Sequence, residues 1–221
     1  MKENKLRSHH PIPTGAGKHT MIAKVQSRRK TFIAGMVLLG FVICAFTRST
    51  NSPTSNAHVG IQLLGFLALV VCILGRTWTS LYISGRKNEQ LVTEGPYSVV
   101  RNPLYFFSII GAFGAGAQFG SMVCGLFFGL IVWGICYIVV LQEENFLFER
   151  HGLTFANYAA NVPRLIPRLS LWRDLPSLTV MPRLVFRTFA DATLFLLAIP
   201  AAETLEFLQD SGVLKILWHL P

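Results

Sequence analysis

Charged side chains are scarce in this chain of 221 residues: Asp, Glu, Lys and Arg together make up 14% of it. A soluble domain carries about 25% charged residues, and its solvated surface depends on them. With four cysteines, the chain also lacks the cysteine density of a disulfide-stabilised secreted domain. What it has instead is 52% hydrophobic residues and a mean hydropathy of +0.47. This composition predicts an integral membrane protein.

Motifs for metal, phosphate or nucleophile chemistry are also missing. All four cysteines lie inside apolar runs and share no ligand spacing, so we interpret them as small buried hydrophobic residues. The six histidines form no paired motif. Neither a glycine-rich phosphate loop nor a serine- or cysteine-centred nucleophile motif occurs. We therefore predict no metal site.

Charge-free runs mark where the chain is expected to cross the membrane. Residues 31–47 form a run of 17, which covers ~25 Å as a helix. The alternative for this run is a cleaved signal peptide, which the long polar stretch before residue 31 disfavours. A second run covers residues 59–75, and the longest, residues 102–142, is enough for two helices joined by a turn around Gln118. Residues 189–208, interrupted by a proline and three acidic residues, are either a fifth, kinked span or an interfacial helix. The predicted fold class is an all-α integral membrane protein with four to five transmembrane helices.

The basic residues lie almost entirely on one side of these expected spans. If the first four spans alternate, eighteen of the twenty Lys and Arg residues fall before the first span, between the second and third, or after the fourth. The positive-inside rule then places the N-terminus in the cytoplasm, most simply at a bacterial inner membrane. The net charge of +9 is thus explained by topology, with the lipid bilayer and its anionic head groups as the partner, and nucleic acid is not needed.

Three regions follow from these patterns. Residues 1–30 have no apolar periodicity and are predicted to form a flexible, basic cytoplasmic extension, in which Met1 and Met21 are both candidate starts. Residues 31–187 are expected to form the helical membrane domain. Residues 188–221 are expected to form a C-terminal transmembrane or interfacial helix.

Polar residues gather before the long apolar run. Arg101 and Asn102 precede Pro103, which suits the first turn of a helix, and Tyr105 falls within that turn. The free N–H groups and the dipole of a helix start favour an anion beside Arg101. Taken alone, Arg101 is better explained as a positive-inside anchor than as a ligand-binding residue.

Further polar residues follow that run. Glu143 and Glu144 form a carboxylate pair that is costly to desolvate unless it faces a polar cavity or a cation. The alternative, which the residues do not exclude, is that the pair marks where the helix leaves the membrane. A third segment holds Tyr158 and Arg164 in a proline-stiffened stretch, and its simpler interpretation is a loop against lipid head groups.

In this order, the three segments resemble one family. The chain is similar to the isoprenylcysteine carboxyl methyltransferases, and phospholipid methyltransferases share the C-terminal part of the pattern. The resemblance covers residues 60–168, about half of the chain, and includes Gly75-Arg76-x-Trp78, which looks like the bacterial branch. Its other motifs are Gly95-Pro96-Tyr97, Arg101-Asn102-Pro103-Leu104-Tyr105, Glu143-Glu144, Tyr158 and Val162-Pro163-Arg164 with Pro167.

The resemblance implies a multi-span helical fold with a C-terminal catalytic segment on the cytoplasmic side, where S-adenosylmethionine is bound. It implies Arg164 and Glu144 as catalytic residues. The cofactor-binding residues that it implies are Tyr97, Arg101, Asn102, Tyr105, Glu143, Glu144 and Tyr158. Two positions depart from the family pattern: Asn102 replaces the commoner histidine, which removes a titratable ring, and Phe155 stands where tyrosine is frequent.

The chemistry of these residues fits the implied cofactor. Arg101 can hold its carboxylate by charge-assisted hydrogen bonds, the glutamates can accept from its ammonium or ribose, and the tyrosine rings can face its adenine or sulfonium. The implied acceptor is lipophilic, either a prenylcysteine-like carboxylate or a phospholipid amine, and is expected to enter from the bilayer between helices. A carboxylate needs no general base, whereas an amine must first be deprotonated.

Two other interpretations remain open. Sterol-reductase-like proteins share part of the C-terminal pattern and use NADPH, although the chain is short for that group. The non-enzymatic alternative is a small helical membrane protein in assembly or transport, with the glutamates as a cation site. Such a protein is expected to carry a charged residue at mid-membrane, and none occurs in the first four expected spans.

Overall fold

The computed structural model describes residues 40, 42, 46–50, 52–85 and 90–220. The predicted extension of residues 1–30 and most of the first predicted span therefore lie outside the described residues. The chain divides into two units, residues 1–42 and 43–221, and all elements named below belong to the second.

Three helices form the centre of this unit: α2 (Asn56–Ile83), α4 (Pro103–Ala117) and α5 (Met122–His151). α2 and α5 are long and apolar enough to cross a membrane, and α4 is a shorter apolar helix. Their starts have local causes. The Ser55 and Ser121 hydroxyls accept hydrogen bonds from backbone N–H groups in the first turns of α2 and α5, and Pro103 opens α4 as predicted. The turn predicted around Gln118 lies between α4 and α5.

Small residues allow α2 and α4 to pack closely. A Cβ atom added to Gly65 would lie 2.9 Å from the Ala117 Cβ, and one added to Gly114 would lie 2.7 Å from the backbone oxygen of Gly65. Further along the same contact, a Cβ on Gly111 would overlap with the sulfur of Cys72. Because lipid gives helices little hydrophobic reason to associate, such small residues stabilise the pair by allowing close van der Waals contact.

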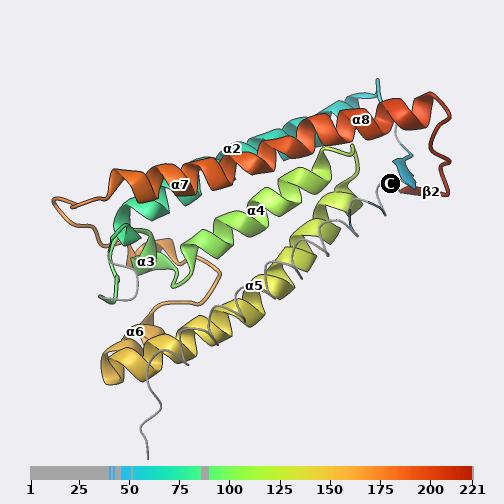
Figure 1. Ribbon diagram of the computed structural model, residues 1–221. Coiled ribbons are helices and arrows are strands. Elements are labelled where there is room, and N and C mark those ends of the chain that lie inside the picture. The colour runs from blue at the N-terminus through green and yellow to red at the C-terminus, as the bar shows by residue number, and fades with distance from the viewer. Residues whose placement is uncertain (1–39, 41, 43–45, 51, 86–89, 221) are drawn as a thin grey trace, which may run out of the picture. The chain divides into compact units, whose positions relative to one another are not determined.

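The C-terminal segment forms a nearly continuous helix of 29 residues. It consists of α7 (Pro182–Thr193), the 3-10 helix η2 (Leu194–Leu197) and α8 (Ala198–Asp210). The whole segment is apolar and long enough to cross a membrane. α7 packs along α2, while η2 and α8 contact α4, and Figure 1 shows α7 and α8 running beside α2. The segment thus lies alongside two other apolar helices, and its crossing of the membrane stays a prediction.

Short elements gather around the start of α4. They are α3 (Pro96–Val99), α6 (Leu153–Asn161) and η1 (Leu169–Leu171). α5 does not end at the glutamate pair, where the span was predicted to close, but continues for about two turns to His151. α2 likewise continues past the predicted span to Ile83, so Arg76 lies within it. Hydropathy marks a membrane boundary, whereas a helix ends at a stop such as Gly152, which follows α5 with φ 54°.

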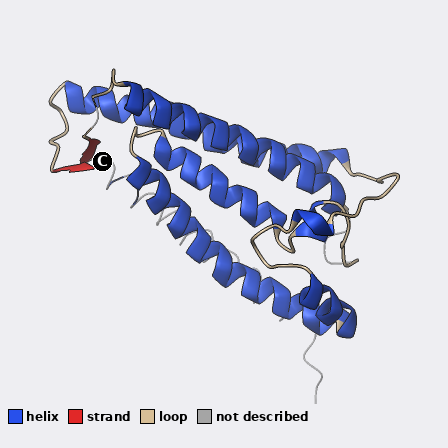
Figure 2. Cartoon of the chain, turned by 180° about the vertical axis from the view of Figure 1, so that it is seen from behind, coloured by secondary structure: helices blue, strands red, loops and turns tan. Residues whose placement is uncertain are grey.

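Two strands of three residues each depart from the all-α prediction. β1 (Thr47–Ser49) pairs in parallel with β2 (Trp218–Leu220). Thr47, predicted as the last residue of the first span, is therefore in a strand. The pairing satisfies backbone N–H and C=O groups of two extended segments and joins the stretch before α2 to the stretch after α8. Figure 2 shows the strands at one end of the helices and the longest loops at the other.

Candidate functional site

The predicted site residues lie at the end of the helices where α3, α6 and the start of α4 meet. Two backbone hydrogen bonds hold the segment after α6 against the segment before α4. Arg101 N donates to Pro163 O at 2.8 Å, and Arg168 N donates to Val99 O at 2.9 Å. These bonds bring Arg164 next to Arg101, although the two are distant in sequence.

Glu144 lies between the two arginines. Its side chain is 8% exposed; Oε2 is 2.9 Å from Arg164 Nη2 and 3.0 Å from Nε, and Oε1 is 3.4 Å from Arg101 Nε. Asn102 Nδ2 donates to Glu144 Oε1 at 3.0 Å and to the backbone oxygen of Arg164 at 3.2 Å. We call Arg101, Asn102, Glu144 and Arg164 the Glu144 cluster. Because two guanidinium groups share one carboxylate, the cluster carries net positive charge and favours an anionic ligand.

The neighbouring glutamate has its own partner. Tyr105 Oη donates to Glu143 Oε1 at 3.0 Å. Tyr105 lies in the first turn of α4, as predicted, and Glu143 lies in α5, so this bond joins the two helices beside the Glu144 cluster. Glu144 itself is buried and ion-paired, so its charge is compensated within the protein.

The two arginines of the cluster differ in electrostatics. Burial lowers the pKa of Arg101 from its ordinary value, and Glu144 opposes this effect. The hydrogen bond to Glu144 raises the pKa of Arg164, whose side chain is 34% exposed. The difference follows from the shorter contacts to Arg164 and the deeper burial of Arg101. Since both guanidinium groups stay protonated, Arg101 is the one whose charge is less compensated and gains more from an anionic ligand.

Tyr97 and Tyr158 lie deeper in the protein. Tyr158 Oη donates to the backbone oxygen of Tyr97 at 2.6 Å, which joins α6 to α3. Tyr97 packs in an apolar cluster with Tyr82 and Val92, and Tyr158 packs with Phe155. Burial raises the pKa of both phenols above the ordinary value. Both tyrosines belong to the frame of the site, and their predicted contact with a cofactor stays a prediction.

One aromatic residue of the site was not predicted. Tyr137 Oη accepts a hydrogen bond from Arg164 Nη1 at 3.4 Å, and the guanidinium carbon lies 5.7 Å from the centre of the Tyr137 ring. The ring stacks on Trp133 with a centroid distance of 5.7 Å. Tyr137 precedes Glu144 by seven residues, about two helical turns, so the two share a face of α5. This spacing is the sequence signal that identifies it.

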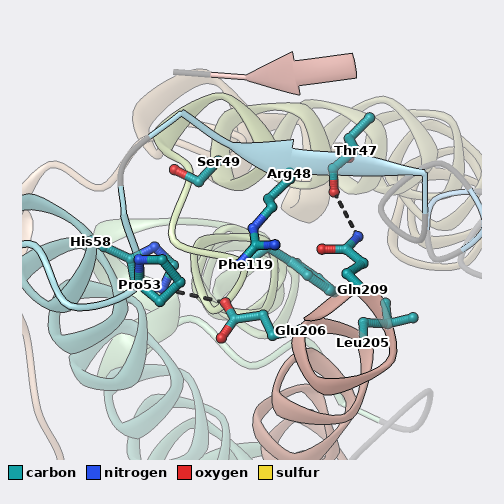
Figure 3. A pocket seen from close by; sticks show the side chains of 9 residues that line it. All are labelled: Thr47, Arg48, Ser49, Pro53, His58, Phe119, Leu205, Glu206 and Gln209. Carbon is teal, nitrogen blue, oxygen red and sulfur yellow. Dashed lines mark hydrogen bonds and ion pairs between the residues drawn. The ribbon is translucent and has the colours of Figure 1, made fainter. Parts of the chain in front are cut away.

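A cavity at the opposite end of the helices is a separate feature (Figure 3). Its lining comes from β1, the start of α2, the turn between α4 and α5, and α8. His58 Nε2 lies 3.3 Å from Glu206 Oε1, and Arg48 approaches Asp210 to 2.6 Å. None of the predicted site residues lines this cavity.

Metal ligands do not gather in the part of the chain that the structure describes: no group of three His, Cys, Asp or Glu side chains comes together there. Cys72, Cys124 and Cys136 are buried, as predicted. Cys44 lies outside the described residues.

Comparison with known proteins identifies relatives of the chain. The family model for phospholipid methyltransferases matches residues 59–153. The chain is 38% identical over 152 residues to the cobalt-zinc-cadmium resistance protein CzcN of Cupriavidus metallidurans, an overlap of 69% of this chain and 70% of that protein. It is 38% identical over 170 residues to the nickel-cobalt-cadmium resistance protein NccN of Alcaligenes xylosoxydans xylosoxydans, covering 77% and 79%.

A more distant similarity extends to enzymes of known reaction. The chain is 32% identical over 112 residues to the protein-S-isoprenylcysteine O-methyltransferase of Schizosaccharomyces pombe, which covers 47% of this chain and 48% of that enzyme. No solved structure matches the chain. The region matched by the family model contains the Glu143–Glu144 pair and the start of α4, which hold most of the site described above.

Proposed function

The chain belongs to the family of phospholipid methyltransferases and isoprenylcysteine-methyltransferase-like membrane proteins, and on this premise we propose that it is an S-adenosylmethionine-dependent methyltransferase acting on a lipophilic acceptor at the cytoplasmic membrane face. The observation that carries the proposal is the Glu144 cluster, in which one buried carboxylate holds two guanidinium groups. Two relatives are named for metal resistance and not for methyl transfer. The proposed activity therefore rests on the site residues.

The residues present fit the proposed cofactor. Its carboxylate suits Arg101, whose Nε is buried and has no hydrogen bond in the described part of the chain beyond the 3.4 Å ion contact with Glu144. The ammonium and the ribose hydroxyls of the cofactor suit Glu143, and its adenine ring suits the aromatic face of Tyr105. When bound, S-adenosylmethionine supplies an electrophilic methyl group that an acceptor takes by in-line displacement.

The cluster residues then have distinct roles. Glu144 is a positioning residue, because it holds both guanidinium groups and thereby fixes where their N–H groups point. Asn102, which replaces the commoner histidine, keeps a hydrogen-bond donor on Glu144 without adding a titratable group. Arg164 is the more exposed arginine, so it is the guanidinium of the cluster that an acceptor can reach. Alignment of this kind can supply ~7–11 kcal/mol of barrier reduction.

The proposal is tested by calorimetry with detergent-solubilised protein. We expect the wild-type chain to bind S-adenosylhomocysteine in the micromolar range and to be stabilised by it against heat. Arg101→Ala and Arg101→Lys should weaken binding more than tenfold, since lysine cannot reproduce the guanidinium fork. Arg187→Ala, at an exposed position on α7, is the matched control and should bind like the wild type.

Two results would overturn the proposal. One is binding that does not change in either Arg101 variant, which would refute the site. The other is stabilisation by NADPH and none by S-adenosylhomocysteine, which would favour the reductase alternative. Protein-dependent transfer of a labelled methyl group into a lipid extract then identifies the acceptor.

A further inference from the structure

Arg76 is a charged residue inside a membrane-spanning helix that the proposed function does not use. It lies in α2, seven residues before Ile83, which places it ~10 Å from the end of the helix. Arg76 directly follows the predicted span of residues 59–75, and a charged group held between apolar helices at this level generally has a ligand or an ion-pair partner. The residue before it, Gly75, lies where α2 and α4 are in close contact: a Cβ added to Gly75 would overlap with the Phe107 ring of α4.

The partner of Arg76 is neutral. Its Nη1 donates to Ser108 Oγ on α4, and the Ser108 hydroxyl donates in turn to Leu104 O at 2.7 Å. Among the described residues, no carboxylate lies within ion-pair distance of Arg76, and its Nε is buried without a hydrogen-bond partner. By contrast, Arg101 and Arg164 share Glu144. Arg76 therefore carries a positive charge and a buried donor that the described protein does not compensate.

The position of Arg76 relates it to the proposed site. Ser108 follows Tyr105 by three residues on α4, a rise of ~4.5 Å, and Tyr105 donates to Glu143. The Arg76 guanidinium is thus about one helical turn deeper in the helix bundle than the Tyr105–Glu143 bond.

We infer that Arg76 binds the anionic group, a carboxylate or a phosphate, of an amphiphile that enters the site from the bilayer. This inference rests on the proposed function for the claim that the amphiphile is the methyl acceptor, but the binding itself does not depend on it. An ionised oxygen ligand neutralises the guanidinium and satisfies its buried Nε. If Arg76 served only as a bond between α2 and α4, a neutral pair would serve without leaving a buried Nε donor unsatisfied.

The inference is tested by thermal unfolding in a non-ionic detergent with three probes of equal chain length. Dodecanoate and dodecyl phosphate carry the two candidate anions, and 1-dodecanol is uncharged. We expect one or both anions, but not the alcohol, to raise the apparent Tm of the wild-type protein by about 3–6 °C at saturation. The anion with the larger effect identifies the head group.

Variants separate ligand binding from structure. Arg76→Gln should lose the anion-dependent shift, and Arg76→Lys should keep part of it because the charge remains. Arg187→Gln removes the same charge from an exposed position and should keep all of it. If Arg76 is only structural, Arg76→Gln and Ser108→Ala will lower Tm alike while the anion-dependent shift survives in both, and the inference is wrong. The inference is also wrong if the anion-dependent rise in Tm is unchanged in Arg76→Gln, whatever Ser108→Ala shows.

S-adenosylhomocysteine binding, measured on the same samples, distinguishes the two proposals. Arg76→Gln should bind S-adenosylhomocysteine like the wild type, because Arg76 lies outside the Glu144 cluster. If the wild-type protein fails to bind it but keeps an Arg76-dependent anion shift, the proposed function is refuted and the anion site stands.

Discussion

Glu144 shows how much one buried side chain decides at this site. Its carboxylate contacts Arg101, Arg164 and Asn102, which come from the segment before α4 and the segment after α6. Removing one partner of a buried ion pair costs more than the pair contributes, because the other charge stays desolvated. The orientation of both arginines therefore depends on this one residue.

We expect Glu144→Gln to destabilise the protein by about 3 kcal/mol, since it leaves the buried Arg101 without a charged partner. Glu143→Gln is the matched control. It removes a charge from the adjacent position but keeps an acceptor for Tyr105, so its cost should stay below about 1 kcal/mol. Thermal unfolding of both variants in detergent measures the difference, and equal losses would contradict the central role of Glu144.

Tyr158 gives a pH-dependent prediction. Burial raises its pKa in the folded protein, whereas the unfolded phenol ionises near its ordinary value of about 10. Above that pH the unfolded chain has lost the proton and the folded chain has kept it, so stability falls as pH rises. We expect Tyr158→Phe to be less stable by about 1 kcal/mol at pH 7, because the bond to Tyr97 O is lost.

Thermal unfolding at a series of pH values between 7 and 11 checks this expectation. The curve of apparent Tm should fall less steeply above pH 10 for Tyr158→Phe than for the wild type. Part of the fall should remain, since the pKa of Tyr97 is raised as well. Parallel curves would show that the Tyr158 hydroxyl titrates alike in the folded and unfolded states.

At the scale of the elements, the contact between α2 and α4 positions the site. α4 carries Asn102 and Tyr105 at its start, and its distance from α2 is set by small residues such as Gly65 and Gly114. The order of the apolar runs predicted these helices, but the runs do not show which helices touch. Glycines indicate a helix contact only where they lie on the sides of two helices that face each other. Which sides face each other is known only from the packed structure.

Gly65→Ala is expected to destabilise the protein by about 1–3 kcal/mol. The added Cβ would lie 2.9 Å from both the Ala117 Cβ and the Gly114 backbone oxygen, so the helices must separate. Gly134→Ala is the matched control in α5, because a Cβ there meets nothing within 4 Å. Apparent Tm values of the two variants should differ by several degrees, and an unchanged Gly65→Ala protein would rule out tight packing at this point.

At the scale of the whole molecule, the arrangement agrees with an alternating path through a membrane. α2, α4, α5 and the α7–α8 segment follow one another, and the Glu144 cluster and the β1–β2 pair lie at opposite ends. The positive-inside count then predicts that the cluster faces the cytoplasm and that the strand pair faces the other side.

Labelling of single cysteines in intact cells tests this topology. In a background without the native cysteines, Lys215→Cys should react with a membrane-impermeant maleimide from outside. Arg168→Cys, near the Glu144 cluster and also exposed, should react only after lysis. Reaction of both positions from the same side would contradict a spanning α7–α8 segment.

The sequence by itself determined that this protein is helical and apolar, where most of its helices run, and which residues are candidates for the site. Hydropathy and helix-starting residues depend on only a few neighbouring positions, so the sequence is sufficient to predict them. Pro103 opens α4, and Tyr105 lies in its first turn. The tertiary structure alone decided that Glu144 holds two arginines, that Tyr137 joins them and that Thr47 pairs with β2. These contacts join segments distant along the chain, and their partners depend on how the helices pack.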